Sequence, residues 1–158
     1  MNMRLQLTGV VLALALGGCA GGARTYSDAL PKNMNVTTTV DGGSKKAAVA
    51  FDIHRVNARC LTEYEGRIDL ENGTIQVGLP ADEPLYLDFI FVTGGGFTSP
   101  VGAVRHGVLF TARSGYDYRA QVTYKNAIYD VEIREARKGS SGGRVVERLP
   151  LSACKPRA

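Results

Sequence analysis

Hydrophobic and polar residues alternate with a period of two along most of the chain after residue 36. The alternation is clearest over residues 118–124 and 129–133, where every second residue is apolar. This pattern is typical of half-buried β-strands. It predicts a hairpin that turns around Lys125-Asn126 and pairs residue 124 with 127 and residue 122 with 129. In that register the apolar residues of both strands share one face.

The same pattern predicts further strands, over residues 36–40, 47–56, 74–79, 85–92, 108–111 and 144–149. The segment 85–92 is apolar on both faces except at Asp88, so we expect it to lie in the centre of a sheet. Glycine- and proline-rich turns separate the segments, and no convincing amphipathic helix is found. Many short strands at this spacing predict an all-β fold, a single antiparallel β-sandwich over residues 36–158.

One local motif adds detail to this fold. The sequence Ser114-Gly115-Tyr116-Asp117-Tyr118 opens a predicted strand and resembles the tyrosine corner of Greek-key sandwiches of the immunoglobulin- and transthyretin-like kind. The resemblance implies that the Tyr118 hydroxyl is hydrogen-bonded to backbone upstream of the strand, with Tyr116 as the competing candidate. The alternative is an ordinary core tyrosine.

The first residues have a different pattern. Arg4 precedes a short apolar run over residues 5–16, and small residues follow it. This arrangement is typical of a secretory signal peptide, and the run is shorter than the roughly 20 apolar residues that a membrane-spanning helix needs.

The small residues lead directly into a cysteine. Leu16-Gly17-Gly18-Cys19 resembles the lipobox of bacterial lipoproteins. The resemblance implies that residues 1–18 are cleaved off, that the Cys19 thiol and amino group carry acyl chains such as palmitate, and that Cys19 is the site of lipid attachment to the bilayer. The alternative is an ordinary signal peptide with a coincidental cysteine.

The residue after Cys19 suggests which membrane is involved. An Asp at that position favours retention in the inner membrane in enterobacterial lipoproteins, and this chain has Ala20. The resemblance therefore implies anchoring to the outer membrane, with the domain either in the periplasm or at the cell surface. Residues 20–35 are small or polar and include Pro31, so we expect residues 19–35 to be a lipidated cysteine with a flexible tether.

Two cysteines remain, Cys60 and Cys154. In an oxidising compartment such a pair most often forms a disulfide, which would tie the C-terminal tail to the early part of the domain. A catalytic thiol or a metal-binding pair is the alternative, but no Cys-x-x-Cys spacing supports it.

The formal net charge of +4 is too small to favour nucleic-acid binding. The charges are nevertheless segregated, because acidic residues dominate residues 61–93 and basic residues dominate residues 134–158. The basic end could contact anionic envelope material, such as lipopolysaccharide phosphates or peptidoglycan carboxylates. The simpler interpretation is a solvated surface balanced by the acidic segment.

Residues that could carry chemistry are few. His54 and His106 have no cysteine or acidic cluster beside them, so they are interpreted as surface residues. Glu63 and Glu65 would share one face of an extended segment, but paired acids on a strand are usually solvated. Asp88 needs a charged partner in its apolar strand, and one of the arginines would serve. The sequence therefore predicts no catalytic residue, no metal site and no cofactor, and it leaves the partner-binding residues unknown.

We expect a noncatalytic binding or assembly module of the cell envelope, with an envelope protein as partner and an exposed apolar patch around Phe97 and Val101. The alternative is an inhibitor or immunity lipoprotein that blocks an enzyme through a protruding loop, either 94–102 or 138–144. An enzyme is disfavoured because no catalytic motif is found.

Overall fold

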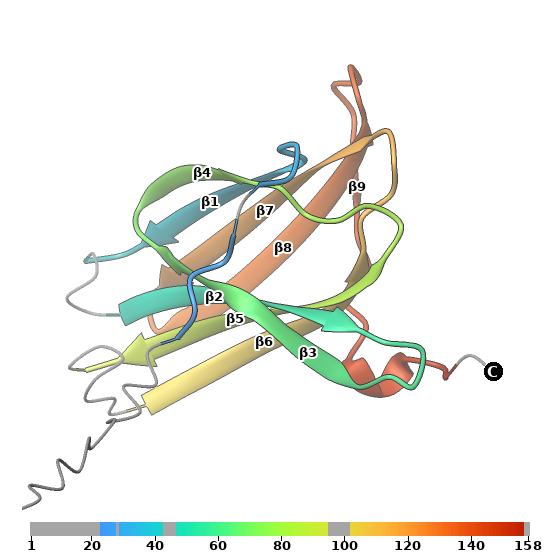
Figure 1. Cartoon of the computed structure of the whole chain (residues 1–158). Coiled ribbons are helices and arrows are strands. Elements are labelled where there is room, and N and C mark those ends of the chain that lie inside the picture. The colour runs from blue at the N-terminus through green and yellow to red at the C-terminus, as the bar shows by residue number, and fades with distance from the viewer. Residues whose placement is uncertain (1–22, 28, 43–46, 95–101, 157–158) are drawn as a thin grey trace, which may run out of the picture.

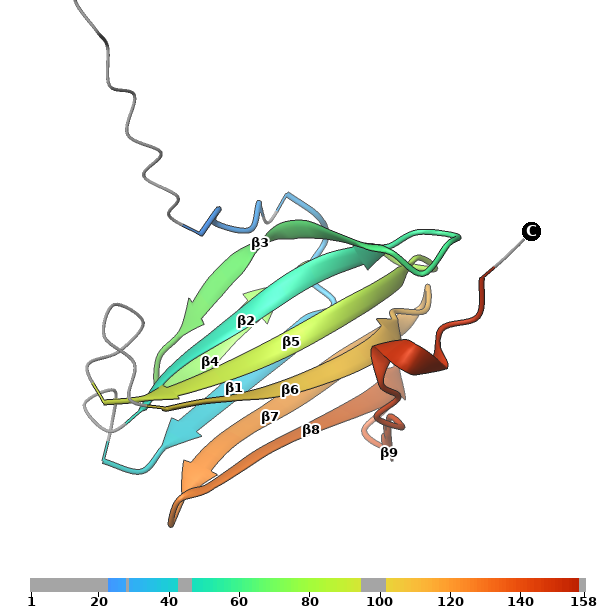
Figure 2. The same cartoon turned by 90° about the horizontal axis from the view of Figure 1, so that it is seen from below.

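The chain folds into two β-sheets packed face to face in the computed structural model (Figures 1 and 2). The structure describes residues 23–27, 29–42, 47–94 and 102–156. The four-stranded sheet has the order β3 (Thr62–Leu70), β2 (Ala47–Val56), β5 (Pro84–Thr93) and β6 (Gly102–Thr111). The five-stranded sheet has the order β4 (Gly73–Val77), β1 (Met34–Val40), β7 (Tyr116–Lys125), β8 (Ile128–Arg137) and β9 (Arg144–Val145). The predicted all-β sandwich is confirmed.

One strand pair departs from the predicted antiparallel arrangement. β1 runs parallel to β7, with Met34 opposite Tyr118 and Val40 opposite Tyr124. Parallel neighbours need a long connection. Here the connection from β1 to β7 contains β4 and all the strands of the four-stranded sheet. The chain therefore passes through the other sheet before β7 pairs with β1.

The core lies between the two sheets, where alternate residues of each strand meet. Phe51 of β2 and Phe89 of β5 are fully buried, and their rings stack with centroids 4.5 Å apart. Burying side chains of this size contributes roughly 1.5–3 kcal/mol each. β5 lies between β2 and β6, which confirms the central position predicted for residues 85–92.

Most predicted strands are present, but β3 was missed and several strands have other bounds than predicted, among them β4, β6, β8 and β9. β3 is an edge strand, rich in charged residues, so its sequence lacks the apolar face on which the other predictions rest. β6 begins at Gly102 instead of residue 108, because its first half is an exposed edge. β9 ends at Val145 instead of residue 149, and beyond it Leu149 bridges to Leu109 in the other sheet.

The hairpin between β7 and β8 exists, but the predicted register is wrong by two residues. Asn126 and Ala127 form the turn, so Tyr124 pairs with Tyr129 and Val122 with Val131. Both turn residues have positive φ angles, 51° and 61°, as a tight hairpin turn of this kind requires. A shift of two residues leaves every side chain on its predicted face.

The predicted tether of residues 19–35 is too long at its C-terminal end. The Tyr26 amide donates to the Arg67 carbonyl at 3.0 Å, and the Arg67 amide donates to the Arg24 carbonyl at 2.8 Å, so this segment runs along β3. Gly66 allows this approach, because a Cβ there would lie 2.5 Å from the Tyr26 Cα. Tyr26 also packs against the core, and Met34 is already part of β1.

Candidate functional site

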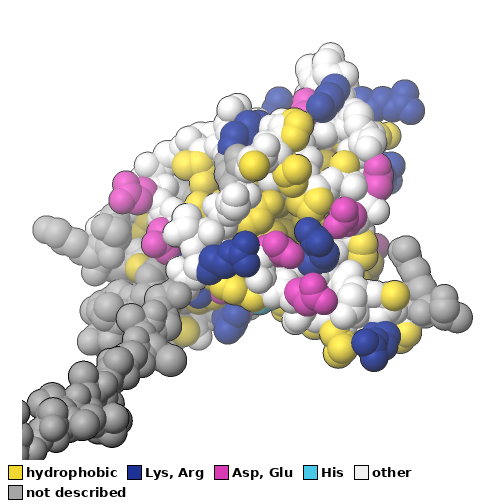
Figure 3. All heavy atoms as spheres, in the orientation of Figure 1, with side chains coloured by type: hydrophobic (Ala, Val, Ile, Leu, Met, Phe, Trp, Pro, Cys, Tyr) yellow, Lys and Arg dark blue, Asp and Glu magenta, His cyan; other side chains and the backbone are white. Residues whose placement is uncertain are grey.

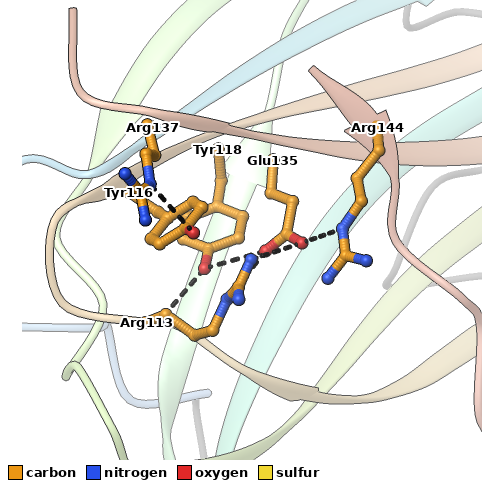
Figure 4. Close-up of polar contacts among 6 residues, drawn as sticks. All are labelled: Arg113, Tyr116, Tyr118, Glu135, Arg137 and Arg144. Carbon is orange, nitrogen blue, oxygen red and sulfur yellow. Dashed lines mark hydrogen bonds and ion pairs between the residues drawn. The ribbon is translucent and has the colours of Figure 1, made fainter. Parts of the chain in front are cut away.

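A buried carboxylate, Glu135, lies at one end of the five-stranded sheet. Glu135 follows the core residue Ile133 on the inner face of β8 and is only 7% exposed. Two arginines meet it (Figure 4). Arg113 donates through Nη2 to Oε1 at 2.7 Å and through Nε to Oε2 at 3.2 Å, and Arg144 donates through Nε to Oε1 at 2.5 Å. A carboxylate buried in this way stays ionised only with such partners.

The two arginines also determine the acidity of Glu135. Burial alone would raise the pKa of this carboxyl. The hydrogen bonds from Arg113 and Arg144 outweigh burial and hold the pKa of Glu135 below its ordinary value. The group is therefore a fixed negative charge at neutral pH.

Tyr118 connects this cluster to the core and confirms the predicted tyrosine corner. Its fully buried hydroxyl accepts a hydrogen bond of 2.8 Å from the Arg113 backbone amide. Burial raises the pKa of the Tyr118 phenol, although the hydrogen bond from Arg113 opposes the shift. The corner holds the turn before β7 in place, so it positions the Arg113 side chain beside Glu135.

Tyr116, the competing candidate for the tyrosine corner, contacts two arginine side chains instead. The Arg113 guanidinium lies 3.9 Å from the centre of the Tyr116 ring, within cation–π distance. The Arg137 Nε donates to the Tyr116 hydroxyl at 3.4 Å. This hydrogen bond holds the pKa of the Tyr116 phenol below its ordinary value, and the nearby positive charge of Arg113 adds to the effect.

The arginines line an open hollow at the base of the loop between β8 and β9. The hollow has a volume of about 570 Å³, and its walls include the glycine-rich loop around Ser140 and Gly142. Figure 3 shows lysine and arginine side chains gathered at this end of the molecule, where Figure 1 places β9 and the loop before it. We call Arg113, Arg137, Arg144, Glu135 and Tyr116 the arginine cluster.

Sequence reasoning found only part of this cluster. Arg137 and Arg144 belong to the predicted basic end, but Arg113 and the role of Glu135 were missed. The sequence did contain a sign that Glu135 is buried, because Glu135 continues the apolar series 129, 131 and 133 on one face of β8. The same reasoning that singled out Asp88 therefore also applies to Glu135.

A second set of ion pairs crosses the outer face of the four-stranded sheet. Asp52 of β2 and Asp88 of β5 lie directly opposite each other and are 4% and 2% exposed. Arg67 of β3 donates to both carboxylate oxygens of Asp52, at 2.7 and 2.8 Å. Arg105 of β6 donates to Asp88 Oδ2, its Nε at 2.8 Å, which identifies the arginine partner expected for Asp88. The four side chains tie the strands of this sheet together.

The two histidines are more buried than predicted. His54 lies beside Asp52 and Asp88, with the rings of Tyr64 and Tyr86 at 5.3 and 6.0 Å. Burial lowers the pKa of His54, although Asp52 and Asp88 oppose the shift. The interpretation of His54 as a plain surface residue is therefore wrong, because these rings cover it.

His106 points into the sandwich and contacts Phe91 edge-on, with ring centroids 5.6 Å apart. Its Nε2 is buried and has no hydrogen-bond partner among the residues that the structure describes. It is therefore a partly buried packing residue of β6, and its interpretation as a plain surface residue is wrong.

Glu63 and Glu65, the acids expected to share one face, lie on β3. Arg55 is 3.5 Å from Glu65 and also 3.5 Å from Glu83. The distances and the exposure of Arg55 are typical of a surface ion-pair network of small energetic weight.

The predicted disulfide between Cys60 and Cys154 is present, with Cα atoms 5.9 Å apart. It joins the turn between β2 and β3 to the C-terminal segment directly after the 3-10 turn η2 (Leu151–Ala153). The C-terminal tail is therefore tied to the early part of the domain, as predicted.

Several predictions lie outside the described residues. They are the signal peptide over residues 1–18, Cys19, Ala20, and the apolar patch around Phe97 and Val101 in the loop 94–102. Within the described ranges, His, Cys, Asp and Glu side chains form no group of three that could hold a metal ion. The same part of the chain contains no helix of the length and hydrophobicity that crossing a membrane requires. Comparisons with protein families, with curated proteins and with solved structures find no match for this chain.

Proposed function

We propose that the protein is a lipoprotein of the bacterial outer membrane, anchored through acylated Cys19, and that its sandwich is a noncatalytic module that binds an envelope protein. The lipobox-like sequence Leu16-Gly17-Gly18-Cys19 supports the anchor. The disulfide Cys60–Cys154 supports an oxidising compartment.

The exposed edge of β6 is the observation that carries the binding function. β6 pairs with β5 along its length, and on its other side the bridge from Leu109 to Leu149 covers only one end. Among the described residues, no strand pairs with the other edge from Gly102 to Val108. Val104 on this edge is 37% exposed. An edge of this kind presents backbone amide and carbonyl groups that an extended partner segment can complete.

The test is photo-cross-linking in intact cells with a photoreactive amino acid in place of Val104. The matched control carries it in place of Ile128, an exposed aliphatic residue in the β7–β8 hairpin. We expect one dominant protein adduct from position 104, weaker or absent from position 128. Equal adducts at both positions, or none at position 104, would contradict β6 as the binding edge.

A third position tests the inhibitor function. The loop between β8 and β9 is exposed over residues 138–143 and protrudes from one end of the sandwich (Figure 1). A photoreactive residue in place of Ser141 would capture an enzyme if this loop blocks a cleft. An adduct at position 141 without one at position 104 would favour the inhibitor over the assembly module.

The anchor is tested separately by membrane fractionation and mass spectrometry. We expect the natural chain in the outer-membrane fraction with an acylated N-terminal cysteine, and a Cys19→Ala chain without acyl groups. We expect Ala20→Asp to move the protein to the inner-membrane fraction. A natural chain that carries no acyl chains would contradict the lipoprotein proposal but leave the β6 test unaffected.

A further inference from the structure

We propose that the arginine cluster is a binding site for a phosphate monoester group, held by Arg113, Arg137 and Arg144 beside the loop between β8 and β9. The inference goes beyond the proposed function, because it depends neither on the lipid anchor nor on the β6 edge. It rests on the geometry of the cluster and on its charge.

Each arginine is oriented by the protein through its Nε side. Arg113 and Arg144 donate through Nε to Glu135, and Arg137 donates through Nε to the Tyr116 hydroxyl. Among the described residues, the terminal amino groups of Arg137 and Arg144 have no hydrogen-bond partner. The side chains of Arg137 and Arg144 are therefore pre-oriented by the protein while donors remain for a ligand.

The three arginines line the same hollow, so their donors can reach one ligand. Arg113 and Arg144 share Glu135 Oε1, and Arg113 lies over the ring of Tyr116, whose hydroxyl holds Arg137 (Figure 4). Donors that approach from three elements suit a tetrahedral group, which offers oxygens in several directions, better than a planar carboxylate.

The charge of the cluster also fits a phosphate monoester. Three guanidinium groups and one carboxylate leave about two positive charges, and a phosphate monoester carries about −1.5 to −2 at pH 7. An adjoining hollow of about 160 Å³ is lined by Arg119, Arg134 and Asp117, and Glu132 pairs with Arg134 there. These neighbours bring no net negative charge to the site.

The same phosphate chemistry occurs on a lipid headgroup and on a soluble phosphorylated sugar. The test uses the full chain in an uncharged detergent and follows the side-chain Nε–H signals of its arginines by NMR. Inorganic phosphate, glucose 1-phosphate and a short-chain phosphatidic acid are added separately. A short-chain phosphatidylcholine serves as the lipid control without a monoester.

We expect the signals of Arg113, Arg137 and Arg144 to shift in a saturable way. Arg137→Gln and Arg144→Gln should each weaken binding about tenfold, because each removes charged hydrogen bonds to the ligand. Arg59→Gln is the matched control, since it removes the same charge from an exposed position in the turn between β2 and β3. Backbone amide spectra confirm that each variant is folded.

The outcomes separate the possibilities. Binding of all three phosphate probes indicates recognition of the group itself, and binding of phosphatidic acid alone identifies a membrane source. The proposal is wrong if no phosphate probe shifts these signals. It is also wrong if Arg59→Gln weakens binding as much as the cluster variants, because the attraction would then depend only on net charge.

Discussion

At the scale of single residues, three buried carboxylates determine where arginines are fixed. Asp52, Asp88 and Glu135 are all less than 8% exposed in the structure and all accept hydrogen bonds from arginine. Removing one partner of such a pair leaves a buried charge and is destabilising, even where the intact pair adds little. The buried carboxylates therefore determine where these arginine side chains lie on both sheets.

Glu135 gives a testable pH dependence. Its pKa is lower in the folded chain than the ordinary value of 4.5. The stabilisation it provides is therefore complete above about pH 4.5 and is lost as the pH falls through the lower folded pKa. We expect Glu135→Gln to lower the free energy of unfolding by about 1 kcal/mol at neutral pH. We also expect the free energy of unfolding of this variant to decrease less than that of the natural chain as the pH falls.

The measurement is urea unfolding of both chains at several pH values from about 7 to about 3. Glu132→Gln is the control, because Glu132 forms an exposed pair with Arg134 on the same strand. The free energies of unfolding of Glu135→Gln and of the natural chain could instead change in parallel with pH. That result would show that Glu135 does not contribute to the acid sensitivity.

At the scale of elements, the turn between β7 and β8 determines the register that brings Glu135 opposite Tyr118. The pattern of apolar residues fixes which face each residue occupies, but it is unchanged by a shift of two residues. The backbone of the turn decides between the two registers, because Asn126 and Ala127 both adopt positive φ. The turn at one end of the hairpin therefore positions the cluster at the other end.

Ala127 is an unfavourable residue for this turn. An alanine at a φ of 61° is strained, because its Cβ lies close to backbone in the left-handed region. We expect Ala127→Gly to raise the free energy of unfolding by about 0.5 to 1 kcal/mol, measured by urea unfolding. Ala112→Gly is the contrasting control, because Ala112 is fully buried and should lose stability. A loss of stability in Ala127→Gly would contradict a strained, positive φ at Ala127.

At the scale of the whole molecule, one covalent link connects distant parts of the sequence. Cys60 and Cys154 are separated by 94 positions, so their disulfide closes most of the domain into a loop. It holds the C-terminal segment against the four-stranded sheet, where Leu149 bridges to Leu109. The same segment follows β9, which carries Arg144 of the arginine cluster.

We expect the double variant Cys60→Ala with Cys154→Ala to lose roughly 4 kcal/mol of unfolding free energy, because a loop of this size strongly restricts the unfolded chain. Urea unfolding with and without a reductant provides the measurement. The reductant should destabilise the natural chain and leave the double variant unchanged. A loss below about 1 kcal/mol would show that the link restrains the unfolded chain very little.

The sequence by itself determined the all-β class, the central place of residues 85–92, the disulfide and the Tyr118 hydrogen bond. Each of these depends on local periodicity, on a short motif or on the pairing of the two cysteines that remain once Cys19 is assigned to the proposed lipid anchor. The lipid anchor at Cys19 also comes from the sequence and is a proposal. The proposed binding function was expected from the sequence, but the exposed edge of β6 that carries it comes from the structure.

Only the tertiary structure decided the rest. It placed β3 at an edge, paired residues 24–26 with that strand, moved the hairpin register by two, and brought Arg113, Arg137 and Arg144 around one hollow. The physical reason is that these features join positions far apart in the chain. A period-two pattern reports which face a residue occupies, but not which strand lies beside it or which side chain meets it across the sheet.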